Sequence, residues 1–203
     1  MAPVHDFIYL ASQSPRRRQL LGQIGVQHQL LLAGDGEDAE ALEATRHGEL
    51  PRVYVERVTR AKLMAARDRL AQRGLPAAPI LCADTTVALG RRILGKPADT
   101  AEAVATLQAL SGRSHRVLTA VAVWDGRRSA LAVSDSSVHF APLPAEIIEA
   151  YVAGGEPFGK AGAYAIQSSL AGWISRIAGS YSGIMGLPLY ETTQLLRRAR
   201  LRF

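Results

Sequence analysis

The 203-residue sequence has one cysteine, few aromatic residues and no long hydrophobic run. The single Cys82 cannot form an internal disulfide, and its apolar neighbours predict a packed small side chain. The longest apolar stretches, such as residues 120–124, are far too short to span a membrane. The short, mixed N-terminal stretch does not resemble a signal peptide. These absences predict a cytoplasmic protein without a membrane partner.

Lysine is also scarce, because Lys62, Lys96 and Lys160 are the only lysines among 24 basic residues. Arginine serves elsewhere as the solvated cation, so each lysine indicates a position that needs a compact ammonium on a flexible stem. The formal net charge of +6 would permit nucleic acid as a partner. However, the basic residues are scattered and no aromatic-rich stripe accompanies them for base stacking, so nucleic acid is not expected.

Apolar periodicity and turn residues predict the fold, and a chain that is 48% hydrophobic can bury one core over residues 1–203. Strands are expected at residues 7–11, 27–33, 79–89, 115–124, 129–140 and 173–178, and helices at residues 15–24, 51–74, 99–110, 144–152 and 188–198. The glycine-rich segment 154–169 is expected to be a loop that leads into short strands. The alternation predicts an α/β fold with a mixed sheet, bent or split into two lobes around a cleft.

The first expected helix begins with an unusual run of charge. Ser14 is a good N-cap and Pro15 suits the first helical position, but Arg16, Arg17 and Arg18 then follow at the positive end of the helix dipole. An anion bound there would explain them, because a helix N-terminus with added guanidinium groups is a phosphate site. In the alternative, the three side chains simply point into water.

Two carboxylates are candidates for chemistry. Asp84 directly follows a buried apolar run, so it either caps a turn or faces a cleft as a base or metal ligand. Glu37 lies in the acidic loop GDGED and is a solvated charge unless that loop folds beside Asp84. In that case the two carboxylates would hold Mg²⁺ or Mn²⁺.

The remaining candidates lie in two tight loops. Lys96 stands between glycine and proline, which fixes the backbone and aims the side chain. Lys160 is followed by AGAYAIQ, where glycines permit close approach of a ligand and the Gln167 amide could read a base edge. Signatures such as HExxH and CxxC are absent, and GSYSG lacks the context of a nucleophile elbow. Metal-dependent attack of water on a phosphate is the chemistry that remains.

Five motifs together resemble the Maf (septum-formation inhibitor) family of nucleotide pyrophosphatases over nearly the whole chain. They are SQSPRR at 12–17, ADTTV at 83–87, GKP at 95–97, GEPFGKAGAYAIQ at 155–167 and GSYSGIMGLPLYET at 179–192. The resemblance implies a Maf/inosine-triphosphatase-like α/β fold with two lobes. It also implies a divalent metal, a homodimer, and hydrolysis of a nucleoside triphosphate to the monophosphate and pyrophosphate.

The resemblance also implies roles for individual residues. Asp84 corresponds to the family's proton acceptor or metal-bound carboxylate, and Glu37 to its acidic-loop carboxylate. Arg17, Thr85 and Gln167 correspond to positions tied to substrate choice, and Gln167 marks the branch that prefers dTTP and UTP. The phosphates are expected at the following residues: Ser12, Ser14, Arg16, Arg17, Lys62, Lys96 and Lys160.

Two other functions remain open at this point. The first is a pyrophosphatase for 7-methyl-GTP or for inosine-type nucleotides, against which the KAGAYAIQ motif argues. The second is a non-catalytic nucleotide- or nucleic-acid-binding regulator of cell division, for which the net charge is the main support. Such a binder would show steeply salt-dependent affinity and no product.

Overall fold

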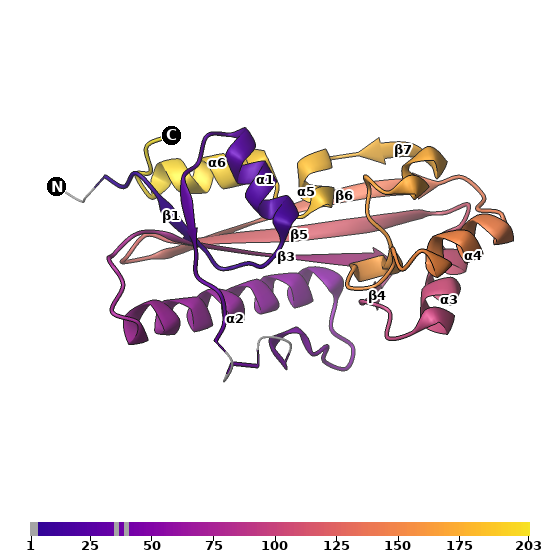
Figure 1. Ribbon diagram of the computed structural model, residues 1–203, viewed down its shortest axis with the longest axis horizontal. Coiled ribbons are helices and arrows are strands. Elements are labelled where there is room, and N and C mark those ends of the chain that lie inside the picture. The colour runs from indigo at the N-terminus through magenta and orange to yellow at the C-terminus, as the bar shows by residue number, and fades with distance from the viewer. Residues whose placement is uncertain (1–3, 35–36, 39–40) are drawn as a thin grey trace.

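The computed structural model describes residues 4–34, 37–38 and 41–203, which form one seven-stranded mixed sheet flanked by helices (Figure 1). The strand order is β2-β1-β3-β5-β6-β7, and β4 also pairs with β3. The strands are β1 (Ile8–Leu10), β2 (His28–Leu30), β3 (Ile80–Leu89), β4 (Arg92–Leu94), β5 (Ser114–Trp124), β6 (Ser129–Phe140) and β7 (Ile174–Ala178). The predicted mixed α/β sheet is thereby confirmed, whereas its division into two lobes stays a prediction.

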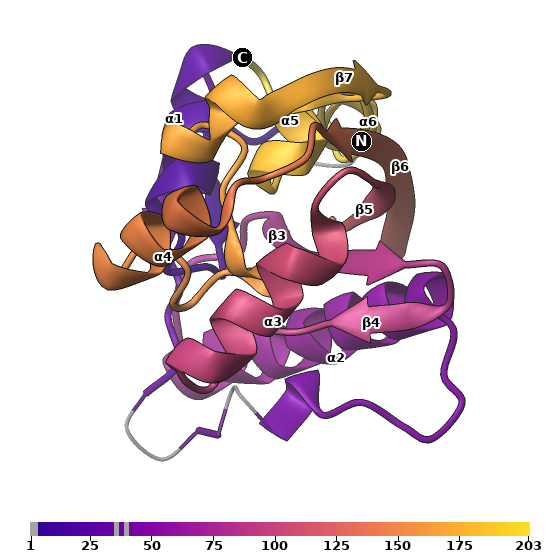
Figure 2. The ribbon, with the colours of Figure 1, turned by 90° about the vertical axis from the view of Figure 1, so that its right-hand side faces the viewer.

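The helices form layers on the sheet. They are α1 (Pro15–Gln23), α2 (Pro51–Gln72), α3 (Thr100–Leu110), α4 (Ala145–Ala153), α5 (Tyr181–Met185) and α6 (Leu189–Arg198). Helix α2 packs along β3 and β5 on one face, while α1, α5 and α6 lie over the other (Figure 1). Helices α3 and α4 pack together at one end of the molecule (Figure 2). Among the described residues, no helix is both long and apolar enough to cross a lipid bilayer.

Local signals explain where several elements begin and turn. The Ser14 hydroxyl accepts the Arg17 amide at 3.4 Å, which caps α1 with Pro15 in the first turn. Asp99 caps α3 by accepting the Glu102 amide at 2.8 Å. These contacts are the ones that the residue types predict.

The central strand β3 creates an opening in the sheet. Its first residues pair with β1 in parallel through Ile80 and Leu81, and its last residues pair with β4 from Val87 onward. Among the described strands, residues 82–86 therefore have a partner on one side only, where β5 runs antiparallel to them. Because neither β1 nor β4 pairs with this stretch, its polar side chains are free of a strand neighbour on that side, although most of the stretch is buried. Asp84 lies at the centre of that stretch.

Two expected elements differ from the structure. The second strand is limited to His28–Leu30, because the chain then leaves the sheet toward the acidic loop. The segment after Gly159 forms short 3₁₀ turns, Ala161–Ala163 and Ser169–Trp173, so the expectation of short strands there was wrong. Gly162 has φ +70°, which is outside strand geometry, and a Cβ at this position would come within 2.7 Å of Val87, so the turn requires glycine here.

Candidate functional site

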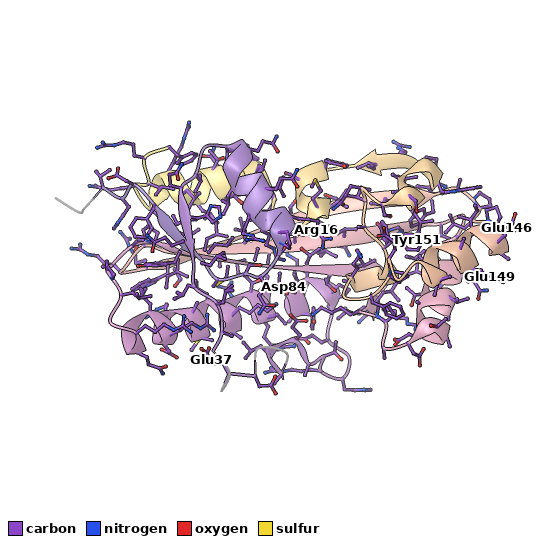
Figure 3. All side chains as sticks on the ribbon, viewed as in Figure 1. Arg16, Glu37, Asp84, Glu146, Glu149 and Tyr151 are labelled. Carbon is purple, nitrogen blue, oxygen red and sulfur yellow. The ribbon has the colours of Figure 1, made fainter. Side chains whose placement is uncertain are left out.

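A cleft of about 1400 Å³ opens over the stretch of β3 that neither β1 nor β4 pairs with. Its walls come from the start of α1, the middle of α2, the acidic loop, the turn after β4 and the segment 159–167. All of the site residues predicted from the sequence line it: Ser12, Ser14, Arg16, Arg17, Glu37, Lys62, Asp84, Thr85, Lys96, Lys160 and Gln167. In Figure 3, Asp84 appears between Arg16 at the start of α1 and Glu37 below it. The fold therefore gathers residues that are far apart in sequence around one cavity.

Asp84 lies at the base of this cleft and is almost completely buried, with 7% of its surface exposed. Its Oδ1 accepts a hydrogen bond from the Lys62 ammonium on α2 at 2.6 Å. Burial of an ionised carboxylate is costly unless it is paired, and Lys62 supplies the pairing cation. The alternative in which Asp84 only caps a turn is excluded, because it lies inside a ten-residue strand.

Lys62 also contacts a carboxylate that the sequence did not single out. Its ammonium lies 2.7 Å from Glu43 Oε1, and the Lys96 ammonium lies 2.7 Å from Glu43 Oε2. Burial alone would lower the pKa of Lys62, but the carboxylates of Asp84 and Glu43 raise it above its ordinary value. Lys62 is therefore fully charged near neutral pH, and two lysines and two carboxylates alternate across the cleft.

Glu37 is placed elsewhere in the cleft wall. The guanidinium of Arg69, a buried residue on α2, donates from Nε to Oε1 at 2.8 Å and from Nη2 to Oε2 at 2.5 Å. This bidentate contact, opposed by some burial, lowers the pKa of Glu37 to about 2. The structure brings Glu43, rather than Glu37, onto the lysine that holds Asp84. A metal-binding role of Glu37 stays a prediction.

Arg17 ties three elements together beneath the start of α1. Its Nε donates to the Gly186 carbonyl at 2.8 Å, its Nη1 to Ser12 Oγ at 3.0 Å and its Nη2 to Thr85 Oγ1 at 3.5 Å. Arg17 thus orients Ser12 and Thr85, and Thr85 directly follows Asp84 in β3. By contrast, the Arg16 side chain makes no hydrogen bond to a described residue and is available to an anion.

Replacing Arg17 with lysine tests this bridging role. A lysine keeps the charge but not the planar fork, so some of the three acceptors lose their donor. We expect the free energy of unfolding to fall by about 1–3 kcal/mol, measured by urea denaturation. Arg18→Lys is the matched control, because Arg18 is exposed and lies outside the cleft. Equal stability of the two variants would contradict the bridge.

The two lysine loops are joined to each other. The Gly162 amide donates to the Gly95 carbonyl at 3.0 Å, which sets the turn that carries Lys96 against the turn that carries Lys160. The Lys160 ammonium donates to the Glu156 carbonyl at the rim. Gln167 is exposed at the same rim and its amide has no hydrogen-bond partner among the described residues. Its amide is therefore available to a polar group of a ligand bound in the cleft.

A cation-lined cleft with a buried carboxylate, at an opening in a mixed α/β sheet, is typical of enzymes that bind and cleave phosphate anhydrides. Comparison with known proteins makes this class specific. The chain belongs to the Maf family, because the model of that family, described as Maf-like protein, matches residues 7–199.

Curated relatives cover almost the entire chain. A protein of Polaromonas sp. (strain JS666 / ATCC BAA-500) is 62% identical over 200 residues, which is 98% of this chain and 99% of the relative. One from Cupriavidus metallidurans is 61% identical over 198 residues, with 98% and 99% covered. One from Burkholderia pseudomallei (strain K96243) is 59% identical over 204 residues, with 100% and 98% covered. All three relatives are named dTTP/UTP pyrophosphatase.

Proposed function

We propose that this protein hydrolyses dTTP and UTP to the nucleoside monophosphate and pyrophosphate. The observation that carries the proposal is the Asp84–Lys62 pair, 2.6 Å apart, at the base of a cleft that also contains Lys96, Lys160 and the start of α1. These groups combine a carboxylate that can take a proton with several cations that can bind a phosphate chain. Relatives about 60% identical over nearly the full length carry the corresponding name, which supports the choice of substrate.

The reaction is the attack of water on the α-phosphorus. The Lys62, Lys96 and Lys160 ammoniums and Arg16 hold the triphosphate, and the start of α1 adds the positive end of its helix dipole. Asp84 accepts a proton from the attacking water while the water oxygen bonds to the α-phosphorus. The bond between the α-phosphorus and the oxygen that bridges it to the β-phosphate then breaks, which releases pyrophosphate. Arg17 supports Ser12 and Thr85, and its direct contact with phosphate stays a prediction.

A divalent cation fits this donor set. Mg²⁺ and Mn²⁺ are typically held by one or two carboxylates together with substrate phosphates and water, and no group of three metal-ligating side chains is needed or found among the described residues. Asp84 would hold the ion, and Glu37, which is paired with Arg69 in the structure, stays a prediction as a second ligand. When bound, the ion would polarise the phosphoryl oxygens and neutralise developing charge.

Pyrophosphate release from a nucleotide panel tests the proposal. With Mg²⁺ or Mn²⁺ present, dTTP and UTP should turn over faster than CTP, GTP, ITP and 7-methyl-GTP, and removal of the metal with EDTA should stop the reaction. Preference for 7-methyl-GTP or ITP would move the protein to another substrate branch. No turnover of any nucleotide would favour the non-catalytic binding protein. Cytoplasmic location and a homodimer are compatible with this proposal and stay predictions.

A further inference from the structure

Glu43 lies inside the cleft but has no role in the reaction proposed above. It ends a short 3₁₀ helix, Ala41–Glu43, and its side chain is 27% exposed. Each of its two carboxylate oxygens accepts from a different lysine, Lys62 and Lys96, at 2.7 Å. A carboxylate that bridges two ammonium groups has the geometry of a bound anion. Here the anion belongs to the protein itself.

The backbone around Glu43 is fixed independently of the lysines. The Tyr54 hydroxyl donates to the Glu43 carbonyl at 2.9 Å, and Arg57 Nη2 donates to the Ala44 carbonyl at 2.8 Å. Arg57 is itself held by both carboxylate oxygens of Glu49, at 2.7 and 2.8 Å. Tyr54 and Arg57 both lie in the first half of α2. The backbone that carries Glu43 is therefore anchored independently of the lysines, whereas its carboxylate is held by Lys62 and Lys96.

The two lysines that are paired with Glu43 are also the ones proposed above to bind the triphosphate. Lys62 is already neutralised by Asp84 and Glu43, and Lys96 by Glu43. A phosphate chain that reached the same ammoniums would lie against the Glu43 carboxylate, where like charges in a partly buried site repel strongly. Either the phosphate binds weakly beside Glu43, or Glu43 moves away.

We propose that Glu43 is a resident anion that occupies a phosphate position on Lys62 and Lys96 in the substrate-free protein and is displaced by the incoming polyphosphate. Two consequences follow. The two lysines stay oriented and neutralised when no substrate is bound, so the lysine side chains themselves need little reorganisation on binding. Part of the binding energy is used to displace Glu43, which weakens the hold on both substrate and released pyrophosphate. The anion-binding claim can be tested alone, whereas its kinetic consequence rests on the proposed pyrophosphatase activity.

Calorimetric titration of the full-length protein with inorganic pyrophosphate, in EDTA and without metal, tests the displacement. Glu43→Gln should bind pyrophosphate on the order of tenfold more tightly than wild type, because the lysines lose their competing charge. Glu43→Ala should do the same, since the Tyr54 and Arg57 contacts reach backbone carbonyls that this variant retains. Asp135→Asn is the matched control: it removes one carboxylate, paired with Arg116 outside the cleft, and should bind as wild type.

Equal or weaker pyrophosphate binding by both Glu43 variants would overturn the proposal. Inhibition by pyrophosphate during turnover gives a second readout: the inhibition constant and the KM for dTTP should both fall in Glu43→Gln, without a rise in kcat. If wild type does not hydrolyse dTTP at all, the pyrophosphatase assignment fails, while the calorimetric comparison still decides the role of Glu43.

Discussion

Replacing Asp84 with asparagine should lower kcat for dTTP by about 10²–10⁴-fold while the protein stays folded. The amide keeps the size of the side chain and can still accept from Lys62, so the packing around β3 survives. It cannot take the proton of the attacking water, and it is a poorer ligand for a divalent cation. Steady-state pyrophosphate release measures the loss, and a thermal melt of the same preparation establishes that the variant is folded.

The control for this variant is Asp68→Asn. Asp68 is exposed on α2 and lies outside the cleft, so its replacement removes the same charge without touching the site. We expect wild-type turnover from it. Near-normal turnover by Asp84→Asn would show that Asp84 is neither the base nor an essential metal ligand, and the proton acceptor would have to be sought at Glu43 or Glu37.

The sequence predicted those parts of the fold that short-range chemistry determines. Ser14 with Pro15, and Asp99 with Glu102, place helix starts because caps depend on neighbours within four residues. The hairpin between β5 and β6 forms where Asp125 accepts the amides of the two residues that close the turn. By contrast, the path after Gly159 depends on long-range packing of Gly162 against Val87, which no local pattern encodes.

Some residues of the candidate site could likewise be predicted from local sequence, and others could not. Asp84 could be found because a carboxylate after a buried apolar run needs an explanation, and the three lysines because they are rare. Glu43 gave no such signal, since a glutamate in an acidic loop is ordinarily a solvated charge. Glu43 reaches Lys62 and Glu37 does not, for two reasons. Arg69 holds Glu37, and the segment before α2 is anchored so that Glu43 lies beside Lys62. These are tertiary contacts between residues far apart in sequence.

A buried histidine supports the loop that carries Lys160 and Gln167. His115 on β5 is 2% exposed, and its Nε2 lies 2.6 Å from the hydroxyl of Tyr164, which lines the cleft. Its ring stacks on Phe140 with centroids 5.5 Å apart. Its Nδ1 has no hydrogen-bond partner among the described residues, so no carboxylate there compensates a positive charge. Burial, with a smaller contribution from His139, lowers the pKa of His115 to about 4.

This shift makes stability depend on pH in a definite direction. In the unfolded chain His115 titrates at its ordinary pKa of 6.5, so between pH 6.5 and 4 the unfolded state binds a proton that the folded state does not. Stability therefore falls as pH falls through that window, by about 1.4 kcal/mol per pH unit and about 3 kcal/mol in all. Above pH 6.5 this contribution is constant, because the imidazole is neutral in both states.

Urea denaturation of wild type and His115→Gln at pH 7 and pH 5 isolates the effect. Glutamine cannot titrate, yet its amide can still hydrogen-bond the Tyr164 hydroxyl, so the variant should lose about 2 kcal/mol less than wild type on acidification. His47→Gln, at an exposed position, should follow wild type at both pH values. If wild type and His115→Gln lose equal stability on acidification, His115 is protonated in the folded protein at pH 5. A protonated ring would need a hydrogen-bond acceptor at Nδ1, and the cluster of Phe140 and Tyr164 supplies none there.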